Sequence, residues 1–258
     1  MRHLDLFSGI GGFTLAAEQV GGIKTTQFVE IDPDAQAVLR SHWRDIPIHE
    51  DIRTYQCSRG NFDLTTVGFP CTGTSIAGTR TGLDHEHSGL WFEALRVINE
   101  CRPRFIIIEN PTGLLSHRLL NRGMDRVLWG LSESGYDAEW QTISAAALKA
   151  PHRRERVFII AYPECLEIHG QKPTCWADQV RDMVQEQRAI SRFPMFESTD
   201  DGAVVRFPDG LDEVPVGVER GSPGRIRSRY LFGRTVVPAC AAIALRRVKY
   251  LNSCIERS

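Results

Sequence analysis

Short apolar runs alternate with longer amphipathic segments through the first two-thirds of the chain. The short runs are rich in β-branched and aromatic residues and are bounded by turn residues, which is typical of buried strands. The stretch "EDIRTY" adds a short third strand that ends at Asp51. The other predicted strands cover residues 3–7, 25–31, 62–68, 104–109 and 156–162.

The segments between these strands have helical spacing, and Leu90, Ala94, Leu95 and Ile98 make one such apolar face. Alternation of strands with helices predicts an α/β fold, in which helices cover both faces of a mostly parallel sheet. The predicted helices cover residues 13–20, 33–43, 88–101 and 119–134, with Pro33 in the first turn of the second and Gly135 just past the fourth.

The pattern changes after Tyr162. Residues 163–228 are rich in Pro, Gly and acidic residues and contain one predicted helix, at 176–190. A second amphipathic helix is predicted at 236–251. We therefore divide the chain into a domain at 1–162, a short segment at 163–228 and a terminal helical part at 229–258.

Ligands of parallel sheets bind beyond the carboxyl ends of the strands, so we expect the functional residues to follow directly after the strands. The first strand runs into "DLFSGIGGF", whose glycines allow a tight turn and close approach to a ligand. The second strand ends at Glu30, where a carboxylate can accept hydrogen bonds from a ribose. The two features favour an adenosine-type cofactor. The glycine spacing departs from the dinucleotide fingerprint, so an NAD-dependent oxidoreductase remains an alternative.

The same edge gathers candidate catalytic groups. Cys71 follows Pro70 at the end of one strand, and Glu109 and Asn110 end the next. Arg154 and Arg156 share a face if the chain is extended there. A thiol, a carboxyl group and two guanidinium groups beside a cofactor turn favour covalent catalysis, although Cys71 could also be a buried structural thiol.

Composition adds two constraints. The 258 residues include 42% hydrophobic and 24% charged residues, which suits a globular chain, and the net charge is −1. The seven cysteines form no C-x-x-C pair, so we expect reduced thiols and no zinc site. No signal peptide and no membrane-spanning stretch is evident, so we expect a cytoplasmic protein.

The charge is unevenly distributed. Residues 195–216 are acidic, whereas the chain from Gly217 onward carries nine Lys and Arg residues against Glu219 and Glu256. Such asymmetry can produce a local basic face on a nearly neutral protein, which favours a nucleic-acid partner. A solvated charged surface is the alternative.

Seven segments together resemble the ordered motifs of the cytosine-C5 DNA methyltransferases. The resemblance covers roughly residues 3–162 and 229–245, and both the order and the spacing of the motifs match. The segments are "DLFSGIGGF", "VEIDPDA", "GFPC", "SGLWFEALRVI", "IIIENPTGLL", "PHRRERVFIIAY" and "FGRTVVPACAAIA".

The resemblance implies a Rossmann-like class I methyltransferase fold and transfer of a methyl group from S-adenosyl-L-methionine to C5 of a cytosine that is flipped out of double-stranded DNA. It implies that Cys71 is the nucleophile, that Glu109 contacts the N3 edge of the ring, and that Arg154 and Arg156 hold the target nucleotide. It also implies a short target-recognition segment at 163–228. The implied cofactor-binding residues are Phe7, Ser8, Gly9, Gly11, Glu30, Ile31, Asp51, Ile52 and Leu90.

Four positions depart from the family pattern: Thr72, Pro111, His152 and Arg234 stand where the family usually has Gln, Val, Gln and Asn. The departures leave one further alternative, a catalytically impaired nucleic-acid-binding module. The short segment at 163–228 leaves another, the same chemistry on RNA, because one branch of the family modifies tRNA. We expect a monomer encoded by a bacterium or phage, and a restriction endonuclease is a candidate partner.

Overall fold

The computed structural model describes residues 1–70, 89–116, 123–164, 174–191, 195–199, 202–206, 231 and 233–256. Cys71 and the departure at Thr72 therefore lie outside the described residues. So do residues 217–230 of the expected basic stretch, among them Arg225 and Arg227. In the described part, no helix is long and apolar enough to cross a bilayer.

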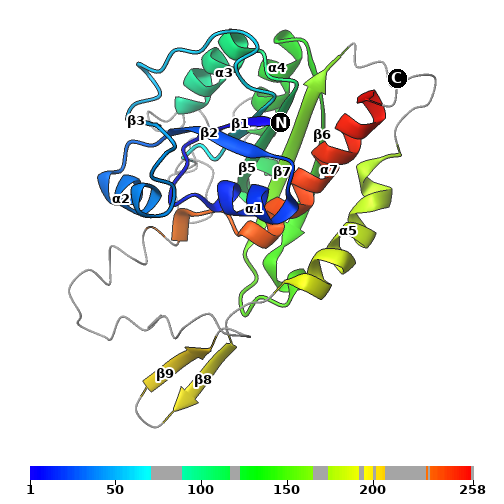
Figure 1. Cartoon of the computed structure of the whole chain (residues 1–258). Helices are drawn as coiled ribbons and strands as arrows, with labels where there is room; N and C mark the ends of the chain where they lie inside the picture. Colours follow the sequence, from blue (N-terminus) through cyan, green and yellow to red (C-terminus); the bar gives the residue numbers. More distant parts are fainter. Residues whose placement is uncertain are drawn as a thin grey trace.

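One seven-stranded sheet organises the molecule (Figure 1). The first five strands in the order β3-β2-β1-β4-β5-β7-β6 run parallel, whereas β7 is antiparallel to both β5 and β6. The mostly parallel sheet predicted from the sequence is thus confirmed. The strands are β1 (Arg2–Leu6), β2 (Lys24–Val29), β3 (Ile48–His49), β4 (Leu64–Val67), β5 (Phe105–Pro111), β6 (Tyr136–Ser144) and β7 (Glu155–Pro163).

Helices cover both faces of this sheet, as predicted. On one face of the sheet, α3 and α4 pack through buried side chains that include Trp91 and Leu131. On the other face, α1, α5 and α7 pack through Phe13, Trp176 and Ile243. The helices are α1 (Gly12–Val20), α2 (Pro33–His42), α3 (Leu90–Cys101), α4 (Met124–Glu133), α5 (Trp176–Ile190) and α7 (Pro238–Glu256), with short 3-10 turns η2 (Thr112–Leu115) and η4 (Ala145–Leu148).

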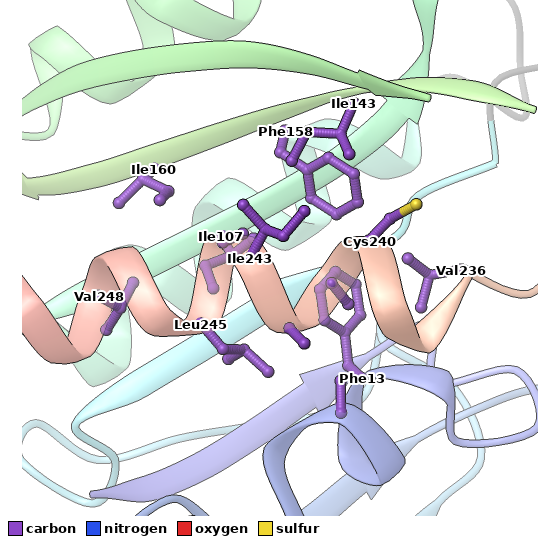
Figure 2. Close-up of a cluster of buried hydrophobic side chains, with 14 of the residues drawn as sticks. Phe13, Ile107, Ile143, Phe158, Ile160, Val236, Cys240, Ile243, Leu245 and Val248 are labelled. Carbon is purple, nitrogen blue, oxygen red and sulfur yellow. The ribbon is translucent and has the colours of Figure 1, made fainter. Parts of the chain in front are cut away.

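The C-terminal helix α7 lies directly against α1 (Figure 2). In the close-up, Cys240 and Ile243 of α7 point into the cluster that contains Phe13. The two segments approach so closely that a Cβ atom on Gly12 would lie 2.7 Å from the carbonyl oxygen of Val236. The close contact holds the segment before α7 beside the turn that opens α1.

Three strands were not predicted from the sequence. Strand β6 escaped detection because Asp137, Glu139 and Gln141 interrupt any apolar run, which an edge strand can accommodate. A hairpin of β8 (Met195–Thr199) and β9 (Gly202–Arg206) lies in the acidic stretch that we expected to be irregular. These strands carry few of the alternating apolar residues that reveal a half-buried strand.

Candidate functional site

The carboxyl ends of β1, β4 and β5 meet at one edge of the sheet. The N–H of Gly68, just past β4, donates to the carbonyl of Leu6 at the end of β1. On the other side, Asn110 Nδ2 lies 3.5 Å from the carbonyl oxygen of Phe69. The backbone that leads into Cys71 therefore lies between the β1 turn and the end of β5, where a parallel sheet presents its ligands.

The turn after β1 has an unusual backbone. Phe7, Gly9 and Gly11 adopt positive φ angles of 56°, 54° and 86°. Phe7 is not a glycine, so this left-handed conformation requires support from its surroundings. Ser8 supplies part of it, because its Oγ–H donates to the carbonyl of Asp5 at 2.7 Å and its N–H donates to the carbonyl of Val29.

The glycines of this turn serve different purposes. We predicted that Gly9, Gly11 and Gly12 let the backbone approach a ligand. A Cβ atom on Gly11 would collide with the ring of Trp43, and a Cβ atom on Gly12 would collide with the segment before α7. A Cβ atom on Gly9 would make only an ordinary van der Waals contact, with Thr235 Oγ1 at 3.6 Å. Among these three glycines, Gly9 therefore has the most room beside its Cα atom.

Glu30 is tied to the same turn. Its Oε2 accepts from the N–H of Gly9 at 2.7 Å, and its Oε1 accepts from the N–H of Asp32 at 2.8 Å. Burial raises the pKa of Glu30, although the backbone hydrogen bonds oppose the shift. Each oxygen retains acceptor capacity, so the carboxylate can also accept from hydroxyl groups of a sugar. The neighbouring Ile31 side chain is 61% exposed and offers an apolar surface beside it.

Arg96, which was not singled out from the sequence, links the loop of Asp51 and Ile52 to the helix that begins at Leu90. Arg96 of α3 donates to the carbonyl of Ile52 at 2.7 Å and to that of Tyr55 at 3.0 Å. The guanidinium thus fastens the Asp51 loop to the helix that begins at Leu90. Glu93 and Glu100 lie three and four positions from Arg96 and both form ion pairs with it. This helical spacing could have identified Arg96 from the sequence.

The cofactor-binding residues expected from the sequence fit an adenosine-type ligand. A half-buried carboxylate at Glu30, an exposed apolar side chain at Ile31 and an open glycine at Gly9 border one edge of the sheet. Asp51 carries a second carboxylate, and the adjacent Arg53 lowers its pKa through hydrogen bonds. Hydroxyl groups, an amino group and an aromatic base all find chemically suitable partners here.

The catalytic half of the site centres on Glu109 of β5. Its side chain is 8% exposed, and Arg156 Nε of β7 lies 3.0 Å from its Oε1. The antiparallel register pairs Pro111 with Arg156, which brings the two side chains to one edge. Burial raises the pKa of the Glu109 carboxyl group, and the charges of Arg156 and Arg154 counteract this only in part.

Arg154 is anchored beside this ion pair. Its Nη1 donates to the carbonyl of Gly233 at 2.6 Å, which links the arginine segment to the chain just before α7. Its Nε is buried, and no hydrogen-bond partner for it occurs among the described residues. Burial, together with the positive charge of Arg156, lowers the pKa of Arg154. A half-buried guanidinium whose Nε–H has no partner among the described residues is well suited to an anionic or polar ligand group.

Two other thiols are poor candidates for a nucleophile. Cys240 is buried near Glu109, and burial raises its pKa to about 12. Cys101 is fully buried, and its pKa also rises, first through its hydrogen bond with Cys57 and then through burial. A thiol with a raised pKa stays protonated at neutral pH and reacts slowly.

Comparisons with known proteins identify the family of the chain. Residues 1–200 match the family model of the C-5 cytosine-specific DNA methylases. The type II methyltransferase M.CviJI of Paramecium bursaria Chlorella virus IL3A is 38% identical over 163 residues, which are 62% of this chain and 42% of that protein. M.HhaI of Haemophilus parahaemolyticus is 29% identical over 170 residues, 66% of this chain and 51% of that protein. The chain spans about half the length of the curated relatives it matches.

Solved structures support the fold. The Entamoeba histolytica methyltransferase EhMeth aligns with a TM-score of 0.61 at 14% identity and covers 98% of both chains. The S. pombe Dnmt2 methyltransferase aligns with a TM-score of 0.53 at 22% identity, over 70% of this chain and 55% of that one. The sheet and helices thus form a Rossmann-like methyltransferase fold. Since the family model spans residues 1–200 of 258, the chain belongs to the C-5 cytosine-specific DNA methylase family.

Proposed function

We propose that this chain transfers a methyl group from S-adenosylmethionine to carbon 5 of a cytosine in double-stranded DNA. The observation that carries the proposal is the buried Glu109, whose pKa is raised and whose partner Arg156 lies 3.0 Å away, at the edge that the chain reaches two residues before Cys71. Family membership and this arrangement support the same chemistry.

Cys71 is the proposed nucleophile. Its thiolate attacks C6 of the cytosine, and the electron pair of the C5–C6 double bond shifts through C4 towards N3. The resulting enamine makes C5 nucleophilic. C5 then takes the methyl group as the bond between that group and the cofactor's sulfur breaks. A base removes the C5 proton, the thiolate is expelled and the proton on N3 returns to Glu109, which restores the aromatic ring. The thiolate is the reactive form, and a positively charged neighbourhood favours it.

Glu109 is the proposed proton donor to N3. Electron density gathers at N3 when the thiolate attacks, and a proton placed there neutralises it. The raised pKa of the Glu109 carboxyl group supports this role, since a protonated carboxyl group is needed near neutral pH. Arg156 limits the shift and keeps the side chain in place, while Arg154 and Arg156 hold the target nucleotide.

The proposed cofactor binds along the turn after β1. S-adenosylmethionine supplies a methyl group on a positively charged sulfur. Glu30 would accept hydrogen bonds from the ribose hydroxyls, and Ile31 and Ile52 would contact the adenine ring. Asp51 would accept from the amino group of the adenine. Phe7, Ser8, Gly9, Gly11 and Leu90 complete the proposed binding surface.

Trapping with 5-fluorocytosine tests the mechanism. With fluorine at C5 there is no C5 proton to remove, so the thiolate cannot be expelled. Duplex DNA with this base should therefore remain covalently bound to the chain after methyl transfer. Cys71→Ser should abolish both the adduct and methyl transfer. The exposed Cys175 provides a matched control, and Cys175→Ser should form the adduct normally. An adduct on Cys71→Ser would disprove the assignment, and tritium transfer to tRNA instead of duplex DNA would disprove the proposed substrate.

Thermal stability in the presence of ligand tests the cofactor. S-adenosylhomocysteine should raise the melting temperature by mass action, because it binds the folded state. Glu30→Gln should reduce the rise, whereas Glu50→Gln, which changes an exposed carboxylate before Asp51, should leave it unchanged. Stabilisation by NAD alone would contradict the proposed cofactor.

A further inference from the structure

Five buried polar side chains beneath the β1 turn form a closed ring of hydrogen bonds. His3 Nδ1 lies 2.8 Å from Thr25 Oγ1, which lies 3.0 Å from Thr14 Oγ1. Thr14 Oγ1 lies 3.3 Å from Asp5 Oδ2, and Thr66 Oγ1 closes the ring at 2.6 Å from Asp5 Oδ1 and 2.7 Å from His3 Nε2. None of the five residues is more than 4% exposed.

The number of protons in this ring is determined by its links. Five links require five protons, and the three threonine hydroxyl groups supply three of them. His3 and Asp5 together must therefore supply two. An ionised Asp5 with a neutral His3 supplies only one, which would leave two lone pairs facing each other in a buried site.

Two arrangements meet this requirement. Either His3 carries both protons as a cation beside an Asp5 carboxylate, or each residue is neutral and carries one. Burial disfavours the charged pair, because neither residue reaches water and Thr66 separates the two groups. In the neutral arrangement all donors run one way around the ring, and either direction makes all five links. In one direction, the Asp5 carboxyl O–H donates to Thr66, whose hydroxyl donates to His3 Nε2. His3 Nδ1–H then donates to Thr25, and the hydroxyls of Thr25 and Thr14 complete the circuit at Asp5 Oδ2.

We propose that Asp5 is held as a neutral carboxylic acid in this ring and acts as a positioning residue for the cofactor turn. The inference rests on the proposed function for its ligand, S-adenosylmethionine. It adds an acid that touches neither the cofactor nor the base.

The ring is well placed for this role. It joins β1, β2, β4 and the first turn of α1, which are the elements that surround residues 7–11. Asp5 and Thr14 lie on opposite sides of that turn, so their contact sets the distance between its two ends. The carbonyl of Asp5 also accepts from Ser8 Oγ, which makes Asp5 the point where ring and turn meet.

The pKa shifts agree with the neutral form. Burial raises the pKa of Asp5 to about 7 and lowers that of His3 to about 3. Hydrogen bonds from Thr66 and Thr14 oppose the shift of Asp5. The carboxylate of Glu30, on the segment after β2, is the charged group among the described residues whose field adds to it.

The imidazole nitrogen resonances of His3, assigned by their loss in His3→Gln, test the protonation directly. We expect a neutral imidazole with a single proton, on Nδ1 or Nε2, between pH 5 and pH 6.5, where a free histidine would be at least half charged. A doubly protonated His3 in this range would overturn the neutral ring.

Matched variants test the positioning role. Asp5→Asn keeps one donor and one acceptor in place of the carboxylic acid, so affinity for S-adenosylhomocysteine should stay within about threefold of the unchanged chain. Asp5→Ala opens the ring and should weaken binding about tenfold or more. Because Asp5→Ala could fail to fold, Thr14→Val and Thr14→Ser provide a milder pair, in which only the valine variant should lose affinity.

The pH profile separates positioning from simple packing. Affinity of the unchanged chain should fall as pH rises through about 7, where Asp5 loses its proton, and Asp5→Asn should not share this fall because an amide cannot ionise. Equal losses in Asp5→Asn and Asp5→Ala, or identical pH profiles, would overturn the role. If S-adenosylhomocysteine does not bind the unchanged chain, the proposed cofactor is wrong and the positioning role falls with it, whereas the His3 spectrum still decides the protonation.

Discussion

Arg156 Nε lies 3.0 Å from Oε1 of Glu109, but this oxygen accepts no hydrogen bond from the described residues. A guanidinium thus lies beside a buried carboxyl oxygen that receives no hydrogen bond from the described residues. Buried carboxyl oxygens are rarely left in this state, because the loss of water is not repaid. A ligand group that approaches Glu109 would find this oxygen available.

Replacing Glu109 by glutamine should reduce methyl transfer by about 100- to 10,000-fold, the usual contribution of a positioned proton donor or acceptor. The amide keeps the shape of the side chain but cannot transfer the proton. Tritium transfer to duplex DNA measures the loss, and binding of S-adenosylhomocysteine should be unchanged. Glu133→Gln, on the exposed end of α4, is the control. Nearly full activity in Glu109→Gln would rule out this role.

The contact between α1 and the segment before α7 predicts a position-specific effect of alanine. Gly12→Ala should lower the free energy of unfolding by about 1–3 kcal/mol, because its methyl group would meet the backbone carbonyl of Val236. In Gly130→Ala the methyl group would meet the flexible end of Leu95, at 2.9 Å. The gain in helix propensity should keep this change within about 1 kcal/mol. Urea denaturation compares the two, and equal losses would contradict the packing argument.

The buried Arg247 predicts a second stability effect. Its guanidinium is 1% exposed and makes two hydrogen bonds to Glu139, at 2.6 and 2.9 Å, and a third to Gln179. Arg247→Met should cost about 3 kcal/mol, since it leaves the Glu139 carboxylate without its partner. Adding Glu139→Leu should recover most of that loss. A double variant that is less stable than Arg247→Met would show that the ion pair itself is stabilising.

The sequence allowed prediction of the parts that depend on local pattern. The spacing of Ala94 and Ile98 identified a helix face, and both residues are buried in α3. Glu30 and Glu109 were identified because strand ends are recognisable and carboxyl ends of parallel strands share an edge. These features require knowledge of neighbours along the chain and of the general rule for such sheets.

The remaining features depend on contacts between distant segments. Arg96 donates hydrogen bonds to carbonyl oxygens more than forty positions away in the chain. Every residue has a backbone carbonyl, so the sequence does not indicate which ones accept. The "HLDL" strand was predicted, but its two polar residues are buried because Thr14, Thr25 and Thr66 supply their partners from three other elements. Strand β6 could not be predicted because its pairing with β7 at the edge of the sheet, more than its composition, makes it a strand.

The ring around Asp5 also predicts how stability varies with pH. In the unfolded chain Asp5 and His3 titrate near 3.8 and 6.5, and in the fold they titrate near 7 and 3. Between pH 3.8 and 6.5 each state binds one proton, so the pair should give no pH dependence there. Below 3.8 the unfolded pair binds the extra proton and stability falls with acid. Just above 6.5 only the folded pair holds a proton, so stability falls slightly until Asp5 ionises.

Asp5→Asn should uncover the contribution of His3, because it removes the carboxyl group that offsets it. His3 alone has a lowered pKa in the fold, so stability should fall as pH drops from 6.5 towards 3. The loss relative to the unchanged chain should reach about 2 kcal/mol at pH 5, at 1.36 kcal/mol for each pH unit. Urea denaturation at pH 5 and pH 7 measures it, with the exposed Asp45→Asn as control. Parallel pH curves for Asp5→Asn and the unchanged chain would mean that His3 and Asp5 do not offset each other.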